Sequence, residues 1–219
     1  MDNRLDTKER ILDAAERLFA EQGFAATSLR AITSGAEANL AAVNYHFGSK
    51  EALIAAVFSR RLDPINQERL AWLDRLEQSA TVEVEQILEA FLDPPLRVSQ
   101  DPHKGEALLH VAQMIGHATS HPDPSLRDLL LSQFDDVVNR FTAALGRCLP
   151  QLEPAELLWR FLFMIGSMAH TMAMSNDIKQ LSKGVCDPQQ VDGLVASMVA
   201  FNAAGFRAPL RTPQPNGRG

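Results

Sequence analysis

The apolar residues of this 219-residue chain recur almost everywhere at helical spacing, and this periodicity constrains its fold more than any other feature. A helix over residues 6–22, for example, places Ile11, Ala15 and Phe19 on one face. No stretch alternates apolar and polar residues for long enough to indicate a strand. The sequence therefore predicts an all-α fold of about nine helices.

Between residues 23 and 53 the helical pattern breaks into short pieces separated by turn residues. Gly23 ends the first helix, and Thr27 or Ser28 caps a helix over 28–34. Asn39 is the expected cap of a helix over 40–46, and the next helix begins at Ser49. A helix this short is not stable by itself, so we expect its neighbours to hold it in place.

Two short helices joined by a tight turn are typical of a helix-turn-helix, whose second helix enters the major groove of DNA. Here residues 28–34 would support a recognition helix at 40–46. Val43 faces the core, which leaves Asn44, Tyr45 and His46 pointing outward. The net charge of −6 argues against a protein that is basic all over, but a local DNA-binding face remains compatible with it.

The stretch from Arg10 to Leu53 resembles the N-terminal DNA-binding domain of the TetR family of transcriptional regulators. The resemblance rests on "ILDAAERLFAEQGF", "TSLRAI" and "YHFGSKEAL", which follow one another in the family's order. It implies a three-helix helix-turn-helix domain over residues 1–50 and a larger helical ligand-binding and dimerisation domain over 51–205. The tail over 206–219, rich in Pro, Gly and Arg, is expected to be disordered.

The same resemblance implies contacts between the short helices and DNA. Phosphates or the groove edge would be contacted by Thr27 and Arg30, base edges by Leu40, Ala41 and Asn44, and the DNA backbone by Tyr45, His46 and Lys50. Asn39 is expected chiefly as a cap, with a DNA contact as the second reading. Three alternatives stay open: Tyr45 packs on the bundle, His46 lies between helices, or Lys50 is only solvated.

The sequence departs from the family's pattern at the turn and in the recognition helix. The family usually has Gly-Val-Ser where this chain has Glu37, Ala38 and Asn39. A left-handed backbone at Glu37 would cost about 1 kcal/mol. The family usually has an aromatic residue where Asn44 stands, and an asparagine is suited to reading adenine.

A stripe of methionines marks one helix of the larger domain. Met164, Met168 and Met172 recur every four residues, Phe161 lies beside them, and Met114 could join them from another helix. Methionine adapts to irregular apolar ligands, so these residues are the candidate ligand-binding set. Ordinary core packing is the alternative for the same pattern.

The C-terminal helices are also candidates for a dimer interface. Gly166 and Ala169 are small residues that allow a close approach between helices, so their helix could pack against its twofold mate. By the family resemblance, the last helix, with Val195, Met198 and Phe201, would complete a four-helix interface between two copies.

The strings "NLAAVNYHFGSK" and "ELLWRFLFMIGSMA" further resemble the PsrA-type, fatty-acid-responsive branch of the family. The resemblance implies a ligand-responsive repressor that binds a palindromic double-stranded DNA operator as a homodimer. A small apolar effector, such as a long-chain fatty acid or an acyl-CoA, would release it. An activator with the same DNA-binding mode and a non-enzymatic helical interaction module remain alternatives.

An enzyme is the least favoured class. The sequence has no paired carboxylates in a plausible site, no Ser/His/Asp arrangement and no Gly-rich phosphate loop, so we expect no catalytic residues and no cofactor. The histidines at 103, 110, 117 and 121 lack converging partners, and we expect no metal site.

The sequence also bears on the location of the protein. The N-terminus is polar, and no apolar run reaches the ~18 residues of a membrane span. Cys148 and Cys186 lie far apart and indicate reduced thiols, with a disulfide as the less favoured reading. We therefore expect a cytoplasmic protein without a membrane partner.

Overall fold

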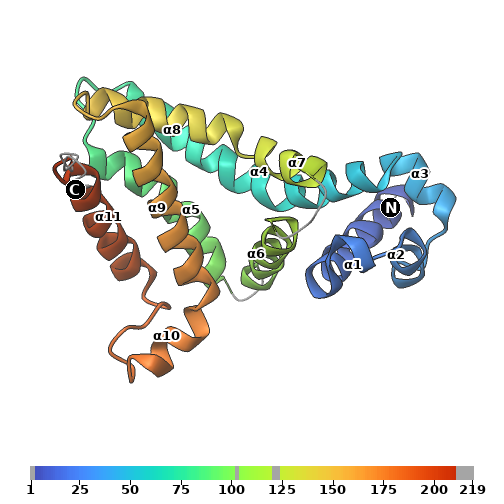
Figure 1. Cartoon of the computed structure of the whole chain (residues 1–219). Coiled ribbons are helices and arrows are strands. Elements are labelled where there is room, and N and C mark those ends of the chain that lie inside the picture. Colours follow the sequence, from blue (N-terminus) through green and yellow to red (C-terminus); the bar gives the residue numbers. More distant parts are fainter. Residues whose placement is uncertain (1–2, 102–103, 120–123, 211–219) are drawn as a thin grey trace, which may run out of the picture.

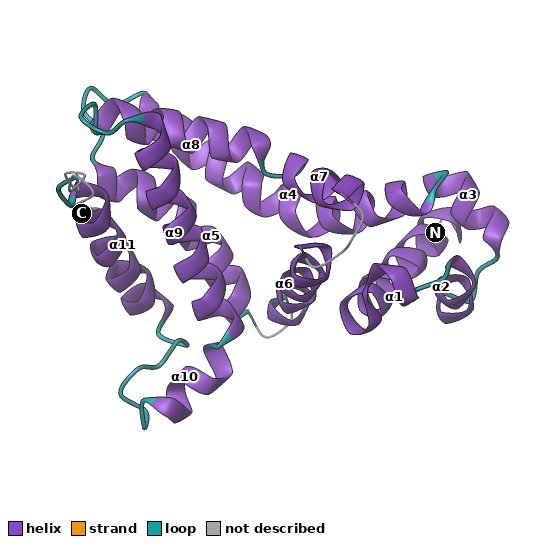
Figure 2. Ribbon diagram, viewed as in Figure 1, coloured by secondary structure: helices purple, strands orange, loops and turns teal. Residues whose placement is uncertain are grey.

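The computed structural model describes residues 3–101, 104–119 and 124–210, and within these ranges the chain forms helices and no strand (Figure 1 and Figure 2). The helices in chain order are α1 (Asn3–Ala26), α2 (Leu29–Gly35), α3 (Leu40–Phe47), α4 (Lys50–Glu77), α5 (Val84–Gln100), α6 (Gly105–Thr119), α7 (Pro124–Ser132), α8 (Asp135–Cys148), α9 (Pro154–Ala173), α10 (Ser175–Leu181) and α11 (Val191–Arg207). The all-α class is confirmed. The expected number of about nine helices is wrong, because the described ranges hold 11.

The first helix is interrupted where the sequence predicts. Gly23 has φ 77° and ψ 171°, which is not helical, although a further turn follows it within α1. A Cβ atom at this position would lie 3.2 Å from Nδ1 of His117 on α6. Glycine therefore serves both the backbone conformation and the close approach of α6.

Two helices continue through prolines, residues that usually end or kink a helix. α4 runs through Pro64, and α5 runs through Pro94 and Pro95. Proline lacks the N–H group that would bond to the carbonyl four residues earlier. In α5 that carbonyl, of Phe91, instead accepts a hydrogen bond of 2.8 Å from Nε of Arg69. A donor from α4 thus replaces the missing backbone bond.

The additional helices arise in the C-terminal half. Residues 124–148 are divided into α7 and α8 by a turn at Gln133 and Phe134. Neither proline nor glycine marks this turn, so the sequence pattern does not reveal it. Asp135 and Asp136 begin α8, where carboxylates interact favourably with the helix dipole. The short helix α10 was not expected either.

The last helix is longer than expected. α11 continues to Arg207, and Phe206 is only 1% exposed. Nη1 of Arg160, on α9, donates to three carbonyls at the end of α11 at 2.8–3.0 Å. The tail therefore does not begin at residue 206, and residues 211–219 lie outside the described part of the chain.

Two apolar clusters form the core. The first joins α1, α2, α3 and the beginning of α4 to α6 and α7, and the second joins the end of α4 to α5, α8, α9 and α11. α4 enters both, with Phe58 in the first cluster and Leu73 in the second. α1, α2 and α3 lie at one end of the molecule, and α9 and α11 lie at the other (Figure 1). The division expected near residue 50 falls at the start of α4 and stays an interpretation.

Candidate nucleic-acid interface

The recognition helix α3 is fixed at both ends by its own sequence. Oδ1 of Asn39 accepts a hydrogen bond of 2.9 Å from the backbone N–H of Ala42. After the helix, the N–H of Gly48, which has φ 79°, donates to the carbonyl of Asn44 at 3.0 Å. The role of Asn39 as a cap is confirmed.

The neighbouring helices are capped in the same way. Ser28 and Ser49 accept hydrogen bonds from the first turns of α2 and α4. Of the two candidates for the cap of α2, Ser28 is therefore the one used. Thr27 is instead 1% exposed, and its hydroxyl donates to the carbonyls of Leu18 and Gly23 at 3.1 and 2.8 Å. The expected contact of its side chain with DNA is contradicted, because that hydroxyl holds the junction between α1 and α2.

The turn between α2 and α3 contains the left-handed backbone that the missing glycine suggested. Glu37 has φ 48°. Its carboxylate is 88% exposed and lies 3.9 Å from Nη1 of Arg10, which is too far and too solvated to offset much strain. The turn therefore has a positive φ at Glu37 without glycine, the residue for which this conformation carries no steric cost.

α3 presents its expected DNA-contacting residues to solvent. Val43 is fully buried and anchors the inner face, whereas Leu40 and Tyr45 are 46% and 72% exposed. The other exposed members of the set are Arg30, Asn39, Ala41 and Asn44. This surface thus combines hydrogen-bonding groups with apolar atoms, the two kinds of group that read base edges in the major groove.

His46 is half-buried next to the exposed Tyr45. Their ring centroids lie 5.0 Å apart at an interplanar angle of 78°, an edge-to-face arrangement. His46 also lies 6.1 Å from the ring of Phe47. Its ring therefore orients Tyr45, and its expected grip on the DNA backbone stays a prediction.

Lys50 has a partner within the chain. Its Nζ donates a 2.6 Å hydrogen bond to the carbonyl of Phe24, and so ties the start of α4 to the end of α1. Burial lowers the pKa of Lys50, against a smaller opposing effect of the charge on Glu51. The reading of Lys50 as merely solvated is contradicted, while its contact with phosphate stays a prediction.

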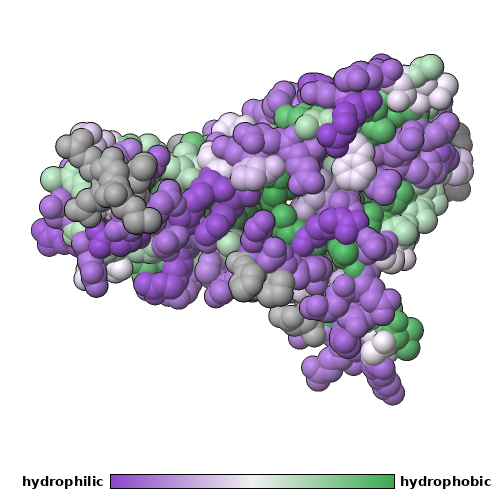
Figure 3. Space-filling view, turned by 180° about the vertical axis from the view of Figure 1, so that it is seen from behind, coloured by the Kyte–Doolittle hydropathy of each residue, from purple (hydrophilic) through white to green (hydrophobic). Residues whose placement is uncertain are grey.

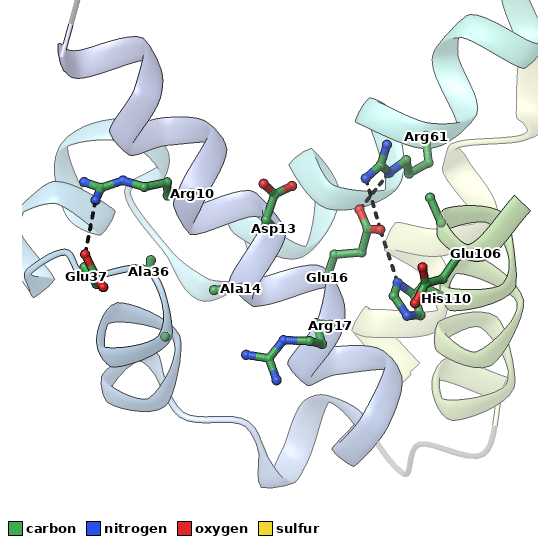
Figure 4. A pocket seen from close by; sticks show the side chains of 12 residues that line it. Arg10, Asp13, Ala14, Glu16, Arg17, Ala36, Glu37, Arg61, Glu106 and His110 are labelled. Carbon is green, nitrogen blue, oxygen red and sulfur yellow. Dashed lines mark hydrogen bonds and ion pairs between the residues drawn. The ribbon is translucent and has the colours of Figure 1, made fainter. Parts of the chain in front are cut away.

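A buried carboxylate that the sequence analysis missed connects the DNA-binding helices to the rest of the molecule (Figure 4). Glu16 on α1, whose side chain is 5% exposed, accepts hydrogen bonds from Arg60 Nη2 at 2.6 Å and Arg61 Nε at 2.7 Å. Nδ1 of His110 on α6 lies 3.4 Å away from the same carboxylate. Three helices thus meet at one charge. Glu16 follows Leu12 by four residues and so lies on the apolar face of α1, which was the available signal.

This cluster lines a hollow of about 590 Å³ between the two parts of the molecule (Figure 4). Arg10, Asp13 and Arg17 of α1 line one side of it, while Glu106 and His110 of α6 line the other. The hollow is wide open to solvent and rich in charge. It therefore does not resemble a site for an apolar ligand.

Two of the four histidines considered for a metal bridge α6 and α1. His110 lies against Glu16, and Nε2 of His117 lies 3.0 Å from the carbonyl of Ala20. They are interhelical contacts, as expected, whereas His103 and His121 lie outside the described residues. Within the described ranges, no group of His, Cys, Asp and Glu is arranged to hold a metal ion.

The candidate ligand-binding residues lie in the interior and do not form one wall. Phe161, Met164 and Met168 belong to the second apolar cluster, while Met114 belongs to the first. Only Met172 packs against both clusters, and it also lines a cavity of about 360 Å³ between α5, α6 and α9. The burial of the other four agrees with the alternative of core packing, and their contact with a ligand stays a prediction.

The outer face of α9 is strongly apolar. Trp159 and Phe163 are 59% and 67% exposed and stack with ring centroids 5.9 Å apart, next to the exposed Leu158 and Leu162. The adjacent α11 contributes Phe201, which is 72% exposed. The exposed apolar residues of α9 form a patch of the kind that marks an interaction surface.

The contribution expected from α11 needs a correction. Val195 and Met198 are 4% and 8% exposed and pack within the chain, so they are not available to a second copy. Other hydrophobic surface is scattered over the larger part of the molecule and at the tip around α10 (Figure 3). No helix in the described ranges is long and apolar enough to cross a membrane.

Two family models match the chain. Residues 11–57 match the bacterial regulatory proteins of the tetR family, and residues 89–205 match the tetracyclin repressor-like C-terminal domain. The regulator AcrR of Shigella flexneri is 25% identical over 156 residues, which cover 71% of this chain and 70% of that protein. The regulator UidR of Escherichia coli K12 is 43% identical over 51 residues, or 23% and 26% of the two chains.

Solved structures show the same fold. The fatty acid degradation regulator FadR from Bacillus halodurans superposes with a TM-score of 0.64 at 14% identity, over 93% of this chain and 97% of that one. A complex of SmeT with triclosan superposes with a TM-score of 0.59 at 24% identity, over 95% and 98%. Because a single family model spans more than half of the sequence and a second covers the helix-turn-helix, the chain belongs to the TetR family of ligand-responsive transcriptional regulators.

Proposed function

We propose that this regulator is a repressor that binds a palindromic operator as a homodimer and is released by a small apolar effector. The observation that carries the proposal is the outward face of α3, where Leu40, Asn44 and Tyr45 are exposed around the buried anchor Val43. Asn44 would read a base, and Tyr45 would contact the DNA backbone. Arg30, exposed on α2, would contact phosphate from the supporting helix.

Dimerisation follows from the apolar face of α9 and α11. Trp159, Phe163 and Phe201 would be covered by the same residues of a second copy, which is the self-complementary arrangement of a twofold interface. Two recognition helices would then address half-sites about one DNA turn, ~34 Å, apart. A palindrome is the operator that matches such symmetry.

The effector is proposed to bind between α5, α6 and α9, where Met172 lines a cavity of about 360 Å³. A long-chain fatty acid or an acyl-CoA is the suggested class, supported by the string shared with the PsrA-type branch and by the structural likeness to a fatty acid degradation regulator. A ligand that favours one spacing of the recognition helices shifts the equilibrium by its differential affinity.

The proposal is tested by selecting sites from random DNA with the purified protein at physiological salt. Enrichment of a palindrome with half-sites about one turn apart supports a dimeric operator binder. A reporter placed behind that operator then separates a repressor from an activator by the sign of the response. Failure of a folded, dimeric protein to enrich any sequence, with and without a long-chain acyl thioester, would favour a helical interaction module instead.

A further inference from the structure

A single arginine lies at the centre of the regulatory half. Arg69 of α4 is 4% exposed. Its Nε donates to the carbonyl of Phe91 at 2.8 Å, its Nη1 to Oδ1 of Asn66 at 3.1 Å, and its Nη2 to the sulfur of Met168 at 3.7 Å. The guanidinium carbon also lies 3.9 Å from the centre of the Phe91 ring. All of these partners are neutral.

Only the Nε atom of this arginine replaces a missing backbone hydrogen bond. Nε satisfies the carbonyl of Phe91, which lost its helical partner because Pro95 has no N–H. The two terminal nitrogens carry four of the five N–H groups of a guanidinium and have only an amide oxygen and a thioether as partners. A thioether sulfur is a weak acceptor, so the outer edge of Arg69 is poorly satisfied.

The charge of Arg69 is also unbalanced. No carboxylate within the described residues lies within ion-pair distance of it, whereas the other buried arginine, Arg160, has Glu156 at 2.7 Å. Burial lowers the pKa of Arg69 to about 9, so the group still carries its charge at neutral pH. A buried, unpaired cation is costly, and ionisable groups perturbed by burial cluster at functional sites.

A route from the cavity beside α9 to this charge would run along one turn of α9. Met172 lines the cavity between α5, α6 and α9, and Met168, one helical turn nearer the start of α9, contacts Arg69. The surroundings of Arg69 are aromatic, since the ring of Phe91 packs edge-to-face against Phe141 and Phe161 at 5.2 and 5.0 Å. Methionine side chains are flexible and can open such a route without moving the helix.

We propose that Arg69 binds the carboxylate of the effector, and that the effector is an apolar molecule with a single free carboxyl group. Its body would lie along Met172 and Met168, and its carboxylate would take the place of the Met168 sulfur at the terminal nitrogens of Arg69. This inference rests on the proposed function and narrows its effector: a free acid fits, whereas an acyl thioester carries no carboxylate at the end of its chain.

The test compares matched ligands on the full-length protein by calorimetry, below their micellar concentrations. The probes are octanoic, dodecanoic and hexadecanoic acid, an aromatic acid, and the primary alcohol of each. Because a hydrogen bond to a charged partner replaces a weak one, the preferred acid is expected to bind at least about tenfold more tightly than its alcohol. Equal affinity for acid and alcohol, or binding of none of the acids, overturns the proposal.

Two variants locate the effect. Arg69→Met is expected to abolish the preference for the acid, while Arg75→Met, which removes an exposed guanidinium from the same helix, is expected to retain it. Preserved acid preference in Arg69→Met would contradict the assignment. If Arg69→Met does not fold, the difference in affinity between each acid and its alcohol, measured on the natural chain, still tests the proposal.

Operator binding is measured on the same preparations. If the natural chain binds its operator but binds the acid and the alcohol equally well, this inference alone is overturned. Absence of operator binding, with acid binding intact, defeats the proposed function alone.

Discussion

The two ends of the molecule are held together by different kinds of interaction. In the DNA-binding part, α2, α3 and α4 each begin at a side chain, Ser28, Asn39 or Ser49, that caps the helix from its own sequence. In the regulatory part, α8, α9, α10 and α11 begin without a side-chain cap. The end of α11 is instead supported from another helix, because Arg160 of α9 donates to the carbonyls of Gly205, Phe206 and Ala208.

This difference shows which helix ends can be predicted from the neighbouring residues in the sequence. A cap acts within one turn, so the residue pattern that encodes it is visible in the sequence. A helix end that depends on a distant donor has no such local pattern. The motifs that carry the resemblance in the sequence analysis lie mostly in α1 to α4, where three successive helices begin at such caps.

The largest expected effect concerns the core that both parts share. Phe58→Ala removes a fully buried ring from the first apolar cluster and should lower the free energy of unfolding by about 3–5 kcal/mol. Since α6 and α7 belong to that cluster, both parts should lose stability together. Urea unfolding is followed by circular dichroism and by the fluorescence of Trp72 and Trp159, which lie outside α1, α2 and α3.

The exposed Leu181, mutated to alanine, is the control and should change stability by less than about 0.5 kcal/mol. A circular-dichroism transition that shifts while the tryptophan transition stays in place would show two independent units and break the idea of a shared core.

A smaller effect is expected at the charge that links the parts. Glu16→Gln leaves Arg60 and Arg61 without their buried carboxylate and should cost roughly 3 kcal/mol at neutral pH. Asp13, 67% exposed and 2.8 Å from Arg60, is the matched control, and Asp13→Asn should cost under about 1 kcal/mol. Equal costs for the two variants would remove Glu16 from its special position.

The same carboxylate should give a pH dependence. Burial by itself raises the pKa of Glu16, but hydrogen bonds from Arg61 and Arg60 outweigh it and hold the pKa below its ordinary value of 4.5. Because this pKa is lower in the folded than in the unfolded state, the contribution of Glu16 is fully present above pH 4.5 and is lost as the pH falls through the folded-state pKa. Below pH 4.5 the free energy of unfolding of Glu16→Gln should therefore fall less steeply with decreasing pH than that of the natural chain, as measured by urea unfolding at a series of pH values.

A still smaller effect is expected on the discrimination between DNA sequences. Asn44→Ala should reduce discrimination at one base pair of each half-site by about 1–3 kcal/mol, measured by repeating the site selection with the variant. Tyr45→Ala is the contrasting variant, since loss of a phosphate contact weakens binding to all sequences alike. An unaltered set of selected sites for Asn44→Ala would remove this residue from base reading.

The smallest effect is expected at two residues with positive φ, one in each part of the molecule. Glu37, with φ 48°, and Lys183, with φ 54°, are the two non-glycine residues with positive φ among those described. Glu37→Gly and Lys183→Gly should each stabilise the fold by up to about 1 kcal/mol, detectable as a raised midpoint in urea. A loss of stability at Glu37 alone would mean that its contact with Arg10 outweighs the strain.

The sequence by itself determined the helical class, the caps of the short helices and the outward face of α3, because each depends on residues close together in the chain. It also placed Asn44 and Tyr45 on the exposed surface and singled out Glu37 as a position where a left-handed backbone would be strained, and the structure has φ 48° there. It misplaced Thr27, whose hydroxyl is taken up by the carbonyls of Leu18 and Gly23.

Only the tertiary structure decided the rest. α5 passes through Pro94 and Pro95, and Arg69, 22 residues before Phe91, supplies the donor that Pro95 lacks. Glu16 becomes a link between the two parts only when α4 and α6 bring Arg60 and His110 to it. In both places a polar group far away in the sequence replaces the missing local partner, and no local pattern records that exchange.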